Sequence, residues 1–317
     1  MSSQALIADY RRYLWSWIES HLSVGVQRRY VRSRSEFACW CNALGVDLSQ
    51  IGAADLDVLV ARFVLHMKEE DDSPLTRQGC LDLLSSLQKR VGQPLRNSLQ
   101  VLRLWSREDP PQQAEAMPSV IAFAMVTVLH LVVQSPAAAF HTLLAFCGCL
   151  RIGESLNLRR CDIVLPRSRH HVQLVVLILR ATKRSFDQRV VIAHPTAVQM
   201  ICDFLALHGP DDVLELAAAM SYGRFARAFK RAVQALQLPG PNWRSHSLRR
   251  GSATSLMEAG MRFEEVRLFG RWASETSARE YIRLGQTALA RLQHRFSAEQ
   301  WRRFEVLAGA SATVFKA

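Results

Sequence analysis

The sequence predicts a mainly α-helical protein with a small antiparallel β-sheet, and three observations support this fold class. Apolar residues recur at intervals of three and four along most of the 317 residues, which is the period of an amphipathic helix. Between positions 161 and 193, short runs rich in β-branched residues replace that period, as in strands. Between 108 and 118, three prolines and a polar run interrupt every periodicity. We therefore expect a helical domain at 1–107, a linker at 108–118 and a second domain at 119–317.

Five helices are expected in the first domain. Apolar residues follow the helical period over 6–18, 30–44 and 56–67, and two further helices are expected over 76–91 and 95–105. Four arginines lie on or next to the second helix: Arg28, Arg29, Arg32 and Arg34. They either bind a polyanionic backbone or form a solvated helix face, and the sequence does not decide between the two.

The second domain is expected to be α+β. Helices over 119–133 and 136–149 come first, and helices resume from residue 196 to the C-terminus. The β-rich runs between them predict a small antiparallel sheet, with the segment 182–187 in the turn between the last two strands. The strands are expected at 161–166, 171–179 and 188–193.

The charge balance points to a polyanionic partner. The chain has 40 Lys and Arg against 28 Asp and Glu, a formal net charge of +12 and a pI near 9.9. Of the basic residues 35 are arginines, whose planar guanidinium can bind two phosphate oxygens at once. A GC-rich genome would explain the ratio of arginine to lysine but not the net charge, so we expect nucleic acid as the partner.

Cysteine usage and hydropathy exclude several other classes. The seven cysteines are scattered and include no Cys-x-x-Cys pair, which argues against a disulfide framework and a zinc site. Residues 1–9 lack the features of a signal peptide, and the apolar run 120–133 is too short to span a bilayer. No acidic set has the spacing of a metal site, and no phosphate-binding Gly-x-x-x-x-Gly-Lys-Ser/Thr loop is present. We expect a soluble, intracellular protein that neither binds a membrane nor needs a metal ion or other cofactor.

Two basic residues near the strand region are candidates for a functional site. Arg151 lies where one predicted helix ends and another begins, but with Glu154 three residues on it could equally form a buried structural ion pair. Lys183 is the only lysine between Lys89 and Lys230, and it falls at the tip of the predicted hairpin. A lysine at such a tip is usually just solvated. In a chain that otherwise uses arginine, however, it indicates a need for an ammonium, which can give up a proton.

Four further candidates lie in the C-terminal third of the chain. His246 and Arg249 stand three residues apart at the start of a predicted helix, so they share a face, and a helix start favours a bound anion. Trp272 and Tyr281 are nine residues apart around a turn and a helix start. Taken singly, the His-x-x-Arg motif is weak and both aromatic residues would be assigned to the core.

Taken together and in order, these segments resemble the tyrosine recombinase (phage integrase) family. The pattern is an arginine, a lysine on a β-hairpin, His-x-x-Arg, and a tryptophan nine residues before a tyrosine. The resemblance covers about residues 118–285, while the helical N-terminal half is similar to the family's core-binding domain in architecture only. The segments 247–254 and 270–272 look most like the recombinases of eukaryotic mobile elements. Many members have His where Trp272 stands and others have Trp, so this position does not put activity in doubt.

The resemblance implies a metal-free strand-transfer reaction on DNA. Tyr281 would attack a phosphate to give a 3′-phosphotyrosine and a free 5′-hydroxyl. Arg151 and Arg249 would bind the non-bridging oxygens, because the transition state places extra negative charge there. Lys183 would protonate the leaving 5′ oxygen, and His246 would share proton handling at the tyrosine. The bond energy stays in the covalent link, so rejoining would need no ATP.

The same resemblance implies further contacts and partners. Trp272 would pack the site and donate its indole N–H toward the phosphate. The partner would be double-stranded DNA, and the active form a homo-oligomer, expected to be a tetramer on two DNA sites. The tail after residue 282 is expected to be a helix that either docks into a neighbouring protomer or folds onto its own domain. The expected DNA-binding residues, including the four arginines of the first domain, are Arg28, Arg29, Arg32, Arg34, Arg184, Arg244 and Arg250.

Two other functions fit parts of the sequence. A type IB topoisomerase would use the same tyrosine chemistry to swivel one duplex, although the separate helical domain favours clamp-like binding of a recombination site. A domesticated DNA-binding protein would keep the fold without the reaction, although every catalytic position is occupied here. In each case the protein is expected where its DNA lies, in a eukaryotic nucleus or in the bacterial cytoplasm and nucleoid.

Overall fold

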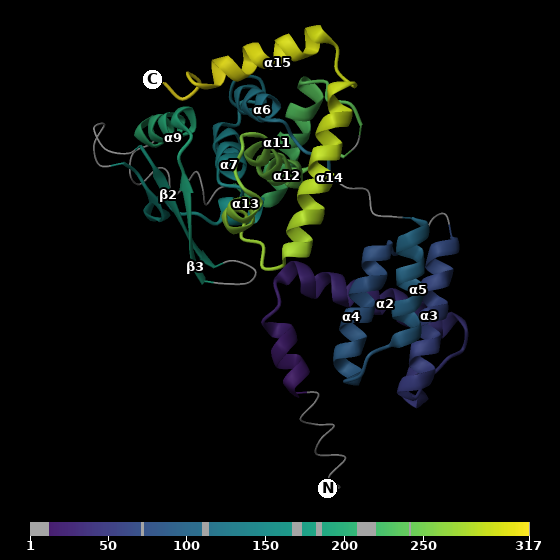
Figure 1. Ribbon diagram of the computed structural model, residues 1–317. Coiled ribbons are helices and arrows are strands. Elements are labelled where there is room, and N and C mark those ends of the chain that lie inside the picture. The colour runs from purple at the N-terminus through teal and green to yellow at the C-terminus, as the bar shows by residue number, and fades with distance from the viewer. Residues whose placement is uncertain are drawn as a thin grey trace. The chain divides into compact units, whose positions relative to one another are not determined.

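The computed structural model describes residues 13–70, 73–109, 114–166, 173–181, 186–207, 220–240 and 242–316 (Figure 1). The chain divides into two compact units, residues 1–111 and 112–317. The division falls inside the proline-containing segment 108–118. The predicted fold class, mainly α with a small antiparallel sheet, is confirmed.

Unit 1 is helical throughout its described part. After a helix at 13–20 come four long helices and one short 3-10 helix: α2 Val24–Ala43, η1 Leu48–Gln50, α3 Ala53–Glu69, α4 Arg77–Val91 and α5 Arg96–Glu108. Phe37, Phe63 and Leu83 lie in one apolar core with residues of all four long helices. Asp57 of α3 accepts hydrogen bonds from the backbone and hydroxyl of Ser98, which fixes the start of α5 against α3.

Unit 2 is built around two almost fully buried helices. α6 Ser119–Leu131 and α7 Pro136–Cys147 pack on each other, and ten consecutive residues of α7, from Ala137 to Phe146, are buried. The other helices of this unit are α8 Ile152–Leu156, η2 Arg160–Asp162, α9 Pro195–Leu207, α11 Tyr222–Ala235, α12 Ser245–Glu258, α13 Phe263–Phe269, α14 Glu275–Gln293 and α15 Ala298–Ser311. Helices α8, α9, α11, α12 and α15 contact α6 or α7, while α13 and α14 pack on α12.

The sheet has three antiparallel strands in the order β1-β2-β3, with bounds Ile163–Val164, Val175–Ala181 and Phe186–Ile192. Strand β3 begins two residues earlier than expected, because Phe186 pairs with Ala181. The expected turn at 182–187 therefore shortens to 182–185. Strand β1 is shorter than expected because the carboxylate of Asp162 accepts the backbone N–H of Arg159 at 3.0 Å and closes the 3-10 turn η2 before it.

The C-terminal segment folds onto unit 2 in this structure. The helix expected past residue 282 is two helices, since α14 ends at Gln293 and Ser297 caps α15 by accepting the backbone N–H of Gln300. Helix α15 lies along α6 (Figure 1), and Thr127 of α6 donates to the Leu307 carbonyl at 2.7 Å. Beyond α15, Phe315 is 1% exposed and its ring contacts those of His130 and Phe204. Within the described residues, no helix is both long enough and apolar enough to span a bilayer.

Candidate active site

Helix α12 carries two of the six catalytic candidates on its first two turns. Arg244 stands at its N-cap, where its backbone N–H donates to Ser247 Oγ at 3.1 Å. His246 and Arg249 follow on one face, as their spacing predicts. His246 remains open to solvent, whereas Arg249 is 2% exposed.

The segment 114–118 enters unit 2 directly against α12. The Met117 N–H donates to the Ser247 carbonyl at 3.1 Å, and Arg250 Nη1 donates to the Ala114 carbonyl at 2.5 Å. A Cβ at Gly251 would stand 1.8 Å from the Met117 carbonyl oxygen. Only glycine fits at position 251, because the two backbones touch there.

The guanidinium of Arg249 is held by main-chain carbonyls. Its Nη1 donates to the Cys149 carbonyl at 2.8 Å and its Nη2 donates to the Gly270 carbonyl. Its Cζ lies 4.8 Å from the centroid of the Trp272 ring, within the range of a cation–π contact. The residue is therefore fixed in position before any ligand binds.

The Trp272 ring is placed by a tight turn after α13. Arg271 adopts a φ of +57°, and the Trp272 N–H donates to the Arg267 carbonyl at 3.1 Å. The ring folds back over Gly270, where a Cβ would stand 1.6 Å from Trp272 Cζ3. The indole can therefore lie over the Arg249 guanidinium only if position 270 carries no side chain.

Tyr281 lies on α14 at the centre of this group. Its ring centroid is 5.2 Å from that of Trp272 at 51°, and the Arg250 Cζ lies 4.9 Å from the tyrosine ring. Its hydroxyl donates to the His246 carbonyl over 3.5 Å, the long limit of a hydrogen bond. Burial raises the pKa of Tyr281 to about 12, against the opposing effect of the neighbouring arginine charges. Without a ligand the phenol is protonated at neutral pH.

Arg151 precedes α8 and pairs with Glu154. Its Nη1 donates to Glu154 Oε1 at 2.7 Å, and its backbone N–H donates to Oε2 at 2.8 Å. The side chain is 34% exposed, so it keeps one side open to solvent. The ion pair that the sequence allowed as a structural alternative is thus present, and it leaves Arg151 accessible.

Glu154 is shared by three arginines. In addition to Arg151, Arg271 Nη2 donates to Oε2 at 2.6 Å, and Arg249 Nη1 lies 3.7 Å from the same oxygen. Burial raises the pKa of Glu154, but the arginine contacts outweigh it and bring the pKa below its ordinary value. The carboxylate is therefore charged at neutral pH and links residues far apart in the sequence.

The imidazole of His246 lies near three arginines. Although the residue is exposed at the surface, protein atoms around the ring replace part of its water, and this effect, followed by the charges of Arg249, Arg151 and Arg250, lowers the pKa of His246 below its ordinary value of about 6.5. The side chain is neutral at pH 7 and can accept a proton.

Lys183 and Arg184 lie outside the described residues. The flanking strands are described, and the pairing of Ala181 with Phe186 makes 182–185 the connection between β2 and β3. The hairpin predicted for Lys183 is therefore present, while its side chain is not placed.

The arginines expected to bind DNA from unit 1 differ in their surroundings. Arg28, Arg29 and Arg32 are exposed along α2. Arg29 Nε donates to Asp82 at 2.9 Å, and Arg32 Nη2 donates to the Pro74 carbonyl at 3.0 Å. Each of these contacts engages one edge of an exposed guanidinium.

Arg34 has an internal function in unit 1. Its Nη1 donates to Glu19 at 2.8 Å and to Ser86 Oγ at 2.5 Å, and its side chain is mostly covered. Arg250, expected to contact DNA from unit 2, is also covered, since it is 5% exposed beneath the Tyr281 ring. Arg244 is exposed.

Two residues that sequence reasoning did not assign to the site belong to its structure. Arg271 contacts Glu154 and the Cys149 carbonyl, and Cys149 supplies the carbonyl that orients Arg249. Cys149 adopts a φ of +46°, and burial raises the pKa of its thiol, so the side chain is an uncharged core group. The position of Arg271 next to Trp272 was the one available sequence signal. Across the described residues, no group of three or more His, Cys, Asp or Glu side chains could hold a metal ion.

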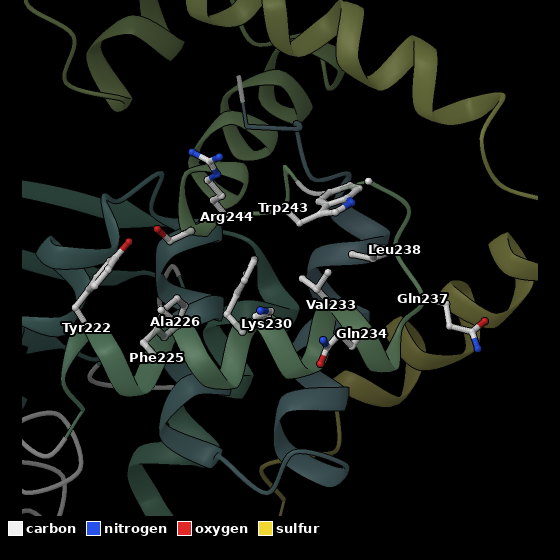
Figure 2. Close-up of a pocket in the computed structure, with 13 residues that line it drawn as sticks. Tyr222, Phe225, Ala226, Lys230, Val233, Gln234, Gln237, Leu238, Trp243 and Arg244 are labelled. Carbon is white, nitrogen blue, oxygen red and sulfur yellow. The ribbon is translucent and has the colours of Figure 1, made fainter. Parts of the chain in front are cut away.

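A separate pocket of about 450 Å³ lies between α11 and the segment 237–245 (Figure 2). Phe229 and Trp243 are buried in its wall, while Lys230 and Arg244 bring positive charge to its lining. None of the catalytic candidates that the structure describes lines it. The pocket borders the first turn of α12 without forming part of the tyrosine site.

Comparisons with known proteins agree with this fold. Residues 127–287 match the Phage integrase family, over half of the chain. The fold is that of the tyrosine recombinases, which indicates a DNA strand-transfer recombinase. The chain belongs to the phage integrase family.

Solved structures of two recombinases share the fold at low sequence identity. XerH site-specific recombinase bound to a palindromic difH substrate, a post-cleavage complex, aligns with a TM-score of 0.56 and 11% identity, covering 90% of this chain and 84% of that chain. A lambda integrase dimer bound to a COC′ core site aligns with a TM-score of 0.55 and 15% identity, covering 89% of this chain and 95% of that chain. A comparison with curated proteins found no match to this sequence.

Proposed function

We propose that this chain is a site-specific DNA recombinase that cleaves and rejoins strands through Tyr281. One observation carries the proposal: α12, the turn before Trp272, and α14 bring Arg249, Trp272 and Tyr281 into one contact cluster. Arg250 also belongs to this cluster, since its guanidinium lies against the tyrosine ring. A phenol surrounded by guanidinium groups suits attack on a phosphodiester, because the charges offset that of the phosphate.

The phosphate would bind between Arg151 and Arg249. Arg151 is partly exposed and already oriented by Glu154, and Arg249 is fixed by two carbonyls with further N–H groups to donate. Fixed donors cost no reorganisation when negative charge grows on the non-bridging oxygens. Removal of one such donor typically lowers the rate by about 10²–10³-fold.

The proposed cleavage step is a balanced transesterification. The Tyr281 oxygen forms a bond to phosphorus and loses its proton, while the bond from phosphorus to the 5′ oxygen breaks and that oxygen takes up a proton. His246 is neutral at pH 7 and accepts the phenolic proton, and Lys183 donates to the leaving oxygen. Rejoining is the reverse, so the energy of the broken bond is kept in the phosphotyrosine and no ATP is consumed.

The substrate would be double-stranded DNA, bound by unit 1 as well as unit 2. Arg28, Arg29 and Arg32 are the proposed contacts of α2, since each is exposed, and each phosphate contact adds about −0.9 to the log–log salt slope. Arg244, and Arg184 on the hairpin, would extend the contact from unit 2. We propose a tetramer on two sites as the active form, carried by a mobile element and located where its DNA lies.

The test is covalent capture from a DNA library. Nicked suicide duplexes with randomised core sequence, together with DNA flanking the gene, are incubated with the protein, and adducts are isolated and sequenced. A Tyr281–3′-phosphate adduct is expected, and Tyr281→Phe should abolish it. The control Tyr222→Phe should still form the adduct, because Tyr222 is exposed and lies outside the cluster of Arg249, Trp272, Tyr281 and Arg250. An adduct on another residue contradicts the assignment.

Product analysis with the selected site separates the alternatives. Two duplexes carrying it should yield exchanged strands. Relaxed supercoils without exchanged products indicate a type IB topoisomerase. Tight binding without any adduct indicates a silent DNA-binding protein.

A further inference from the structure

The buried guanidinium of Arg271 has no part in the reaction as proposed so far. It is the third arginine on Glu154, and its side chain is 7% exposed. The residue adopts a φ of +57°, a left-handed conformation that non-glycine residues rarely adopt. This conformation lies at the position where the chain turns the Trp272 ring over Arg249.

The contacts of Arg271 all point inward. Its Nη2 donates to Glu154 Oε2 at 2.6 Å and to the Cys149 carbonyl at 3.4 Å, and its Nη1 donates to the Phe269 carbonyl at 3.3 Å. These are groups of the protein interior, and one of them, the Cys149 carbonyl, also accepts a hydrogen bond from Arg249. Arg271 therefore acts on the site from behind, through groups it shares with the catalytic candidates.

The two oxygens of Glu154 are not equally occupied. Oε1 accepts Arg151 Nη1, while Oε2 accepts both the Arg151 backbone N–H and Arg271 Nη2. Arg249 Nη1 stays 3.7 Å from Oε2, beyond hydrogen-bond distance. Arg271 thus fills the place on the carboxylate that Arg249 would otherwise take.

The charges lead to the same conclusion. Three guanidinium groups and one carboxylate leave two net positive charges for a phosphate. Without Arg271 there would be one, and the carboxylate would draw on Arg151 and Arg249 alone. With Arg271 gone, the buried carboxylate would keep its contacts with Arg151 and would attract the remaining nearby cation, Arg249, more strongly.

We propose that Arg271 is a positioning residue that neutralises Glu154 and so keeps Arg249 directed at the scissile phosphate. The inference rests on the proposed strand-cleavage function. Arg271 itself does not contact the substrate. Its effect is on the chemical step rather than on DNA affinity, because the charge it supplies acts within the site through Glu154.

The experiment combines three variants with a matched control. Arg271→Met removes the charge, Arg271→Lys keeps it, and Glu154→Gln/Arg271→Met removes both partners. The control is Arg262→Met, which breaks an exposed ion pair with Glu265 on α13. Single-turnover adduct formation is measured at saturating protein on the captured site, together with DNA affinity.

Arg271→Met is expected to cleave about 100-fold more slowly than wild type with little change in DNA affinity. Arg271→Lys should stay within about tenfold of wild type, and the double variant should recover at least about tenfold over Arg271→Met, since charge balance returns. A purely structural role would make the double variant no better than the single one. That result overturns the proposal. Equal losses of cleavage rate in Arg271→Lys and Arg271→Met, or a wild-type rate in Arg271→Met, also overturn it.

A crystal structure of Arg271→Met without DNA gives a readout independent of activity. The distance from Arg249 Nη1 to Glu154 Oε2 should fall from 3.7 Å into hydrogen-bond range. An unchanged distance overturns the positioning role even if the variant cleaves slowly. A shortened distance in a protein whose wild type forms no adduct supports the charge arrangement and contradicts the proposed function instead.

Discussion

Replacing Arg249 and Arg151 separately by methionine should give similar losses of cleavage and very different losses of stability. Both guanidinium groups are proposed to bind the same phosphate, so each variant should lose about 10²–10³-fold in the rate of adduct formation. Their surroundings in the protein differ. Arg249 is 2% exposed, whereas the Arg151 side chain is 34% exposed.

The stability loss for Arg249 follows from its contacts. It donates to the carbonyls of Cys149 and Gly270, and hydrogen bonds from a charged donor contribute about 1.5–3 kcal/mol each. The contact with the Trp272 ring adds about 0.5–2 kcal/mol. Arg249→Met should therefore destabilise unit 2 by at least about 3 kcal/mol, or roughly 6–12 °C in melting temperature for a unit of this size.

Arg151 has one ion pair at the edge of solvent, and such pairs contribute about 0–1 kcal/mol. The bond from its backbone N–H to Glu154 survives the substitution. Arg151→Met should therefore shift the melting temperature by less than about 4 °C.

Thermal unfolding followed by circular dichroism, paired with single-turnover cleavage below either melting point, separates the two effects. Equal melting shifts for the two variants would refute the account of Arg249 as a group fixed by buried carbonyls. A stable Arg249→Met protein with normal cleavage would refute both its structural and its catalytic assignment.

Three further outcomes are expected. Gly270→Ala should lower the free energy of unfolding by about 1–3 kcal/mol and slow cleavage, because the added Cβ would overlap the Trp272 indole ring. The control Gly153→Ala, whose Cβ would meet nothing within 4 Å, should melt at or above the wild-type temperature. Equal melting temperatures of the two variants would contradict the close contact at Gly270. In an NMR titration of the DNA-free protein, His246 should become protonated below pH 6.5, since its pKa is lowered. The stability that the neutral side chain contributes is therefore lost as the pH falls from about 6.5 through the lowered pKa of the folded protein. Protonation of His246 above pH 6.5 would contradict the positive charge around it. Phe315→Ala should lower the free energy of unfolding by about 3–5 kcal/mol at any protein concentration, because Phe315 is buried. The control Val306→Ala, at a residue that is 74% exposed, should change it very little. A loss that depends on protein concentration would indicate that the tail binds a neighbouring protomer.

Much of the fold could be predicted because its periodicities are local. The buried helix α7 and the antiparallel hairpin each follow from residues close together in the chain. The helix break at 294–297 was not predicted, although Ser297 and Gln300 form a capping box. The apolar period continues on both sides of the break, and periodicity locates the buried face of a helix better than its end.

The candidate site was predictable as a set of residues but not as a structure. Order and spacing selected His246, Arg249, Trp272 and Tyr281, and the structure brings these four together. The role of Arg271 depends on a left-handed backbone conformation and on a carboxylate 117 residues earlier in the chain. Neither feature produces a periodic pattern in the sequence, so the contacts of Arg271 become visible only in the three-dimensional structure.

The segment 114–118, at the start of the described part of unit 2, is joined to the helix of the catalytic candidates by its main chain. The Met117 N–H donates to the Ser247 carbonyl in α12, and the Glu115 N–H donates to the Asn242 carbonyl just before that helix. The backbone at Met117 also touches Gly251 with no side chain between them. A displacement of residue 114 would therefore reach the helix of His246 and Arg249 through main-chain hydrogen bonds and a direct backbone contact, with no side chain between them to absorb it.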